Sequence, residues 1–183
     1  MPARRRSAQL GTLLATLLLA AGCGATEPEP LTAVKPEVPA DLCATIPAAD
    51  RAGLIANSNT DLTPNPTAAC SLRSSDGAAT EVHAVVTWIQ TNDEQSAADV
   101  LDSQCRALDR QKFRQQTGFD AEGSDKSCAG SGKVDGADSA TMAASSGVEV
   151  VTVRLSSLPP GKSPVMPRAQ NMLEGVLSSL AGS

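Results

Sequence analysis

The sequence predicts an α+β fold in which an antiparallel sheet of about four strands, arranged as two hairpins, is covered by helices mainly on one face. Three observations predict this fold. Apolar residues alternate along two pairs of segments, and each pair flanks a short turn. Apolar residues recur with helical spacing in segments 92–114 and 168–180. Four cysteines follow residue 40, and an even number is typical of two disulfides.

Residues 1–22 have the organisation of an export signal. Three arginines beginning at Arg4 precede an apolar run at 10–22, which is shorter than the roughly 20 apolar residues that span a bilayer. The motif from Ala20 to Cys23 resembles the lipobox of bacterial lipoprotein precursors. This resemblance implies cleavage before Cys23 and a diacylglyceryl group on its thiol, which would anchor the exported protein to the outer face of the cell membrane. The alternative is an ordinary signal peptide that leaves Cys23 as a free thiol.

Residues 23–40 are rich in proline and poor in apolar side chains. Such a composition is typical of a segment that does not pack. We expect a tether in polyproline II geometry, which reaches roughly 50 Å at about 3.1 Å per residue. Residues 41–183 are then a single extracytoplasmic domain of ordinary size.

The charge and aromatic content of the chain exclude several kinds of partner. The chain has a net charge of −5, and this becomes more negative once the arginines of the signal peptide are removed. Nucleic-acid binding requires a basic surface, so we expect no nucleic-acid partner. The chain has one tryptophan, two phenylalanines and no tyrosine, which disfavours sites that stack bases or sugars on aromatic rings.

The four cysteines of the domain allow three disulfide pairings. We favour the two pairings that are local in sequence, Cys43 with Cys70 and Cys105 with Cys128. A zinc site is the alternative, but no two of these cysteines are two to four residues apart, as zinc ligands usually are. We therefore expect disulfides and no metal.

The sequence at the start of the domain predicts a short helix followed by a loop. Thr45 can cap the helix, Pro47 suits its first turn, and Leu54 and Ile55 would be its buried residues. Residues 57–69 are polar and interrupted by proline, so we expect a loop there.

A hairpin is predicted next. Segments 70–74 and 80–90 flank Ser75-Asp76-Gly77, and Asp-Gly is a strong turn signal. One face of the second strand is apolar and should face the core, with Val82, Ala84, Val86 and Trp88.

A helix is predicted from Asn92 or Asp93 to about Arg114. Its buried stripe should consist of Ala97, Leu101, Cys105 and Leu108. Residues 115–137 are rich in glycine, serine and aspartate, so we expect a long connection pinned by Cys128.

The sequence of the last part of the domain predicts a second hairpin and a C-terminal helix. Segments 138–144 and 148–156 flank Ser145-Ser146-Gly147. Residues 168–180 have the most regular helical pattern of the chain, with Ala169, Met172, Leu173, Val176, Leu177 and Leu180 on one face.

This organisation resembles a family of small actinobacterial lipoproteins known as a domain of unknown function, DUF3558. The resemblance rests on Asp41-Leu42-Cys43 followed by Pro47, on Cys70 at the start of a strand, and on Val134 to Asp138 before the third predicted strand. The strand at 148–155 and the helix at 168–180 complete it. It implies an envelope lipoprotein and brings no catalytic residues.

We find no catalytic constellation in the chain. His83 is the only histidine, and its place in the alternation puts it on the surface of the sheet. Residues 130–133, Gly-Ser-Gly-Lys, lack the upstream glycine and the following serine or threonine of a phosphate-binding loop. We therefore expect neither an enzyme nor a bound cofactor.

Two charged clusters have ordinary explanations. Five acidic residues could bind calcium weakly, but their spacing does not match an EF-hand, and we expect solvated carboxylates at Asp120, Glu122, Asp125, Asp135 and Asp138. Three arginines spaced by four could dock an anionic partner, but interleaved aspartates predict a salt-bridged helix face for Arg106, Arg110 and Arg114.

Together these patterns predict a membrane-anchored lipoprotein with a non-enzymatic binding or interaction domain. The expected partner is an envelope protein, a wall polymer or a small apolar ligand. The alternative is a carrier of an apolar small molecule or lipid, which would need a pocket between sheet and helix. The residues that would line this pocket are Val86, Trp88, Leu173 and Leu177.

Overall fold

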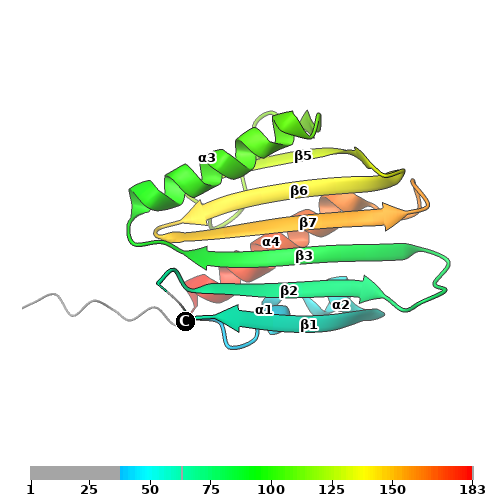
Figure 1. Ribbon diagram of the computed structural model, residues 1–183, viewed down its shortest axis with the longest axis horizontal. Coiled ribbons are helices and arrows are strands. Elements are labelled where there is room, and N and C mark those ends of the chain that lie inside the picture. Colours follow the sequence, from blue (N-terminus) through cyan, green and yellow to red (C-terminus); the bar gives the residue numbers. More distant parts are fainter. Residues whose placement is uncertain (1–37, 63, 183) are drawn as a thin grey trace, which may run out of the picture. The chain divides into compact units, whose positions relative to one another are not determined.

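Seven antiparallel strands form one sheet in the order β1-β2-β3-β7-β6-β5-β4 (Figure 1). This computed structural model describes residues 38–62 and 64–182, so the predicted signal peptide, Cys23 and nearly all of the tether lie outside the described residues. The strands are β1 (Leu54–Asp61), β2 (Thr67–Ser74), β3 (Glu81–Gln90), β4 (Arg114–Gln115), β5 (Lys126–Val134), β6 (Ala137–Ser146) and β7 (Glu149–Leu158). The helices are α1 (Leu42–Thr45), α2 (Ala48–Arg51), α3 (Glu94–Arg110) and α4 (Val165–Ala181).

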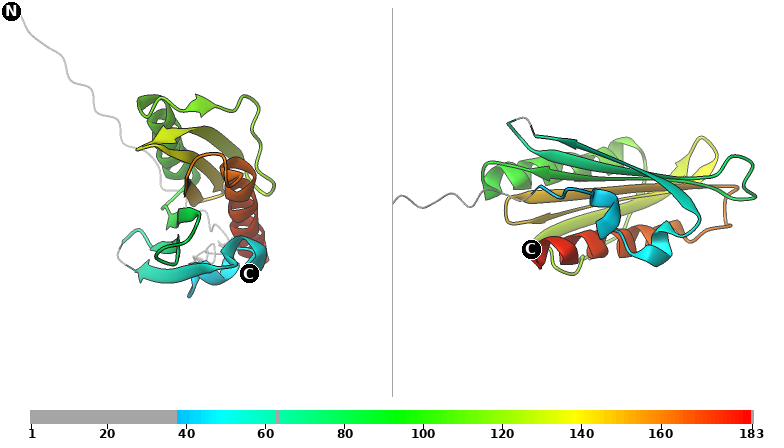
Figure 2. Two further views of the ribbon diagram at one scale, coloured as in Figure 1. Left: turned by 90° about the vertical axis from the view of Figure 1, so that its right-hand side faces the viewer. Right: turned by 90° about the horizontal axis from the view of Figure 1, so that it is seen from below.

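The helices lie on both faces of the sheet. Figure 2 shows α4, with α1 and α2 beside it, on one face, and α3 on the other. We call the face under α4 the core face. The opposite face is covered by α3 only over β5, β6 and part of β7, and we call the remainder, over β1, β2, β3 and β7, the open face.

The hydrophobic core fills the space between the core face and α4. Its largest fully buried side chains include Trp88, Leu72, Met172 and Leu173. The strands contribute every second residue, because successive side chains of a strand point to opposite faces. A smaller buried group lies under α3 and comprises Ala97, Leu101, Leu108, Phe113, Ala143 and Val150.

The α+β class and both predicted hairpins are confirmed, but the expected number of strands is wrong. β2 pairs with β3 across the turn that contains Asp76-Gly77, and β6 pairs with β7 across Gly147. Three strands were not expected, namely β1, β4 and β5.

Residues 54–61 form a strand where a helix end and a loop were expected. Leu54 and Ile55 begin β1, and Ile55 is 45% exposed rather than buried in a helix. Asp41, not Thr45, caps the first helix, with its carboxylate accepting a hydrogen bond from the backbone N–H of Cys43 at 2.9 Å. β1 has no alternating apolar pattern because nearly all of it is exposed on both faces.

Residues 126–134 form a strand where a long connection was expected. The glycines of β5 are needed for close packing, since a Cβ atom on Gly132 would lie 2.9 Å from Cδ1 of Phe113. The turn after β5 has Asp135 and Gly136 at φ 49° and 83°, a left-handed pair that suits a two-residue hairpin. β5 therefore pairs with β6 over its whole length.

Both long helices are confirmed, with shifted ends. The carboxylate of Asp93 caps α3 by accepting a hydrogen bond from the backbone N–H of Ser96 at 2.7 Å, and this bond lowers the pKa of Asp93. α3 ends at Arg110, so Arg114 lies in β4 and does not continue the helix face of Arg106 and Arg110.

Both disulfides form with the favoured pairing. Cys43 of α1 is bonded to Cys70 of β2, and Cys105 of α3 to Cys128 of β5. The first bond joins the start of the domain to the core face of the sheet. The second holds α3 against the opposite face.

Glu149, at the start of β7, is a half-buried carboxylate beside Trp88. Burial raises the pKa of Glu149 above the value of 4.5 usual for an exposed glutamate, and the indole N–H of Trp88 partly opposes this rise. The folded chain therefore holds the proton more tightly than the unfolded chain. Ionised Glu149 consequently destabilises the folded state above its raised pKa, and this penalty disappears as the pH falls below 4.5.

Glu149→Gln is therefore expected to raise the free energy of unfolding at neutral pH and to leave it nearly unchanged at about pH 4, where the wild-type carboxyl is protonated. Urea denaturation at both pH values measures the difference. Glu122→Gln, at an exposed loop position, is the matched control and should change neither value. A Glu149→Gln variant with no gain at neutral pH would contradict this account.

Candidate functional site

The four residues predicted to line a pocket are part of the packed core. Val86, Trp88 and Leu173 are 0% exposed and Leu177 is 2% exposed. All four belong to the cluster between the core face and α4. Neighbouring side chains cover them, so they offer no surface to a ligand arriving from solvent.

The open face presents an array of mostly small and polar side chains on three adjacent strands. Antiparallel register places residues of β2, β3 and β7 in rows across the sheet. One row contains Arg73, His83 and Ser156. The next two rows contain Ser71, Val85 and Arg154, and then Ala69, Thr87 and Thr152.

Three adjoining hollows follow this face along the strands. The first, of about 500 Å³, lies at the β2–β3 hairpin and includes Arg73, Glu81 and His83. The second, of about 420 Å³, lies between the end of α3 and the sheet and has Phe113 in its wall. The third, of about 320 Å³, lies beside the middle of α3 at Gln104.

Shared residues make the three hollows into one groove. His83 and Ser156 line both the first and the second, and Val85 and Arg154 line both the second and the third. The groove thus runs along the open face beside α3, and we call it the open-face groove.

Arg154 lies where the second and third hollows meet. Its Nη2 donates a hydrogen bond to Oε1 of Gln104 on α3 at 3.3 Å, and it forms no ion pair with any described residue. Neither of the two hollows is lined by an aspartate or a glutamate. Arg154 is therefore a positive charge without an ion-pair partner in the part of the groove whose described lining has no carboxylate, in a chain whose net charge is −5.

At the end of the groove near the β2–β3 hairpin, acidic side chains offset the positive charge of Arg73. Nη1 of Arg73 lies 3.5 Å from Oδ1 of Asp76, and both side chains are largely exposed. Such exposed pairs contribute little to stability, but they do cancel charge locally. Glu81 lines the same hollow. An anionic ligand would therefore meet net positive charge near Arg154 and not at this end.

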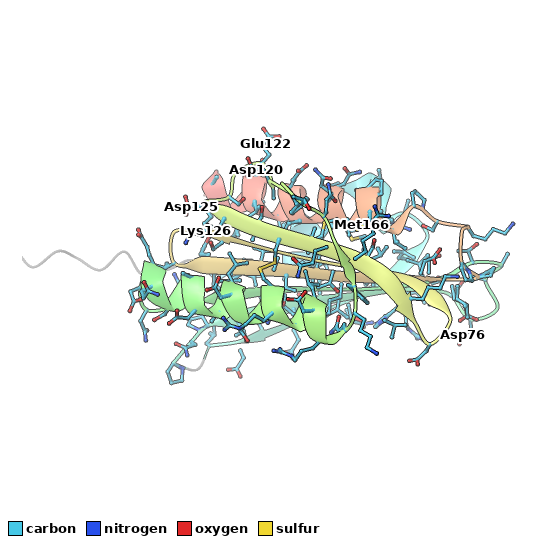
Figure 3. All side chains as sticks on the ribbon, turned by 90° about the horizontal axis from the view of Figure 1, so that it is seen from above. Asp76, Asp120, Glu122, Asp125, Lys126 and Met166 are labelled. Carbon is cyan, nitrogen blue, oxygen red and sulfur yellow. A yellow bond between two sulfur atoms is a disulfide. The ribbon has the colours of Figure 1, made fainter. Side chains whose placement is uncertain are left out.

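The other candidate residues stand apart from one another. His83 lies exposed on the open face, where the sequence pattern placed it. Asp120, Glu122 and Asp125 lie at the opposite end of the domain from Asp76 (Figure 3). Asp125 Oδ2 and Asp138 Oδ2 accept hydrogen bonds from the backbone N–H groups of Gly147 and Gly161. Within residues 38–62 and 64–182, no three histidine, cysteine, aspartate or glutamate residues gather into a possible metal site.

Sequence reasoning missed Arg154. The available signal was the alternation Thr152, Arg154, Ser156 on the second strand of a hairpin, which places all three on the face away from the core. The described lining of the groove around Arg154 has no carboxylate. This depends on how β2, β3 and α3 pack together, which the sequence does not reveal.

None of the described helices has the length and apolar character needed to cross a membrane. No protein-family model, curated protein or solved structure matches the chain.

Proposed function

We propose that the chain is an exported lipoprotein, anchored through Cys23, whose domain binds an anionic ligand of the cell envelope in the open-face groove. The observation that carries this proposal is the guanidinium of Arg154, which forms no ion pair with a described residue and lies where the described lining of the groove has no carboxylate. The lipobox, the tether and the two disulfides support an extracytoplasmic setting.

The groove offers suitable chemistry for such a ligand. Guanidinium groups bind carboxylate or phosphate through paired, charge-assisted hydrogen bonds. Hydroxyl groups of Thr87 and Ser156 lie close by in the rows of the open face and can bond to further polar atoms. Val85 and Phe113 supply apolar contact in the same hollow.

The role we propose is binding and not catalysis. His83 is exposed, and among the described residues no carboxylate is hydrogen-bonded to its side chain, as a triad would require. The carrier alternative receives no support from the core residues that it needed, because they are covered by their neighbours.

Arg154→Gln is expected to weaken binding of an anionic probe about tenfold or more, because hydrogen bonds to charged groups contribute about 1.5–3 kcal/mol. The probes are poly(glycerol phosphate) and hexaglutamate, with hexaglutamine as the neutral counterpart of the peptide. Calorimetry on residues 24–183, which lack the lipid-bearing Cys23, measures the affinity. Amide shifts in β3 and β7 locate the site.

Arg110→Gln is the matched control, because Arg110 is exposed on α3 and does not line the groove. It should retain wild-type affinity. Preference between the two probes would distinguish a phosphate from a carboxylate ligand. The proposal fails if neither probe binds, or if both arginine variants lose affinity equally, since the attraction would then be nonspecific.

A further inference from the structure

The two edges of the sheet are protected to different degrees. At one edge, β4 pairs with Gly130 and Ser131 of β5. Ser127 extends this cover, because its Oγ accepts from the backbone N–H of Ala121 and donates to the carbonyl of Phe119. Lys126 lies at one end of β5, and charged edge residues discourage strand addition. This edge is therefore closed to a further strand.

Within the part of the chain that the structure describes, the β1 edge has none of these protections. β1 is last in the strand order, and all eight of its residues pair in continuous register with β2, without a bulge. From Ile55 to Thr60 it has no charged residue and no proline, and each of these residues is exposed. An edge strand directs unpaired backbone N–H and C=O groups outward, and natural sheets normally shield such a row.

We propose that β1 is a self-association surface that pairs antiparallel with β1 of a second copy of this chain. Residues 56–60 of two copies can pair about a two-fold axis that passes between Ser58 and its own copy, and in this register no like charges lie opposite each other. Amide and hydroxyl side chains then meet across the pair. The outward backbone N–H and C=O groups of one copy can then form hydrogen bonds with the same groups of the second copy.

The contrast between the edges sets the size of the assembly. A contact between identical surfaces about a two-fold axis closes at two copies, whereas growth would require a second open edge. The edge at β4 and β5 is covered, so the assembly ends as a dimer. Antiparallel pairing places the axis perpendicular to the sheet, so both open faces lie on the same side of one continuous sheet.

Sedimentation equilibrium on residues 24–183, which lack the lipid-bearing Cys23, tests this inference. We expect a dimer in the wild type and at least a tenfold weaker association constant in the double variant Asn57→Lys, Asn59→Lys, which places four positive charges along the paired edge. The matched control is Gln95→Lys, Ser103→Lys, at two exposed positions of α3, which packs against the other end of the sheet, so that the same charge is added away from β1. It should associate as the wild type does.

Amide hydrogen exchange of the wild type provides a second readout that does not depend on any variant. Amides of β1 that face outward should become protected as protein concentration rises, while amides of β4 and β5 should not change. A wild type that is monomeric up to about 1 mM overturns the inference. A dimer whose formation leaves β1 exchange unchanged overturns it as well, because the contact would then lie elsewhere.

Discussion

Replacing Trp88 by alanine is expected to lower the free energy of unfolding by about 3–5 kcal/mol, the range found for large aromatic residues truncated in a core. Trp88 is fully buried on the core face, opposite Ala68 on one side and Val151 on the other. Its neighbours are held by the strand register and by α4, so they can only partly collapse into the space that the indole leaves. Urea denaturation followed by circular dichroism measures the change.

Trp88→Phe is the informative companion variant. Nε1 of Trp88 lies beside the Glu149 carboxylate but makes no hydrogen bond of normal geometry among the described residues, so phenylalanine mainly removes volume. We therefore expect Trp88→Phe to cost clearly less than Trp88→Ala. Equal losses in the two variants would contradict the view that packing volume determines the effect.

The same variant tests the carrier alternative. In the wild type the space is filled, so a small apolar probe such as benzene should not bind. In Trp88→Ala an apolar cavity should open and bind it, as engineered apolar cavities do. Binding of benzene to the wild type would instead support the alternative that the domain carries an apolar small molecule.

Removing the Cys43–Cys70 disulfide is expected to have the second large effect. The two cysteines are 27 residues apart, and the chain-entropy estimate for a loop of that size is about 3–4 kcal/mol. A double change to alanine should lower the melting temperature by roughly 10 °C, at about 2–4 °C per kcal/mol for a chain of this length. Differential scanning calorimetry measures it.

The Cys105–Cys128 pair is the matched comparison. Its sequence separation is 23, so the loop-closure contribution is nearly the same. Cys43 and Cys70 are 4% and 0% exposed, whereas Cys105 and Cys128 are only half-buried. Removal of the first pair therefore also disturbs core packing and should cost more. A larger loss for the second pair would contradict this ranking.

The elements predicted correctly are those in which one face is buried and the other is not. β3, α3 and α4 have this property, and their apolar residues recur at the period of their structure. Both cysteine pairs were also predicted, because the pairings that are local in sequence were favoured. These features depend on residues close together in the chain.

The strands that were missed lack that contrast. β1 is exposed on both faces, so no apolar alternation marks it. β5 is rich in glycine because Phe113 lies against Gly130 and Gly132, and that packing is invisible before the fold is known. The Asp135-Gly136 turn was the one local signal available, and it resembles the Asp-Gly turn that identified the first hairpin.

The Cys43–Cys70 bond also determines how mechanical load enters the domain. When force is applied to the N-terminal end of the domain, it reaches residue 43 before it reaches any strand. The covalent bond then passes it directly to β2, which is flanked by β1 and β3. β1, which lies between the two cysteines in sequence, is then outside the path of the force. Without the disulfide, β1 would be the first strand to bear the force and to separate from the sheet. The disulfide transmits the force to β2 instead.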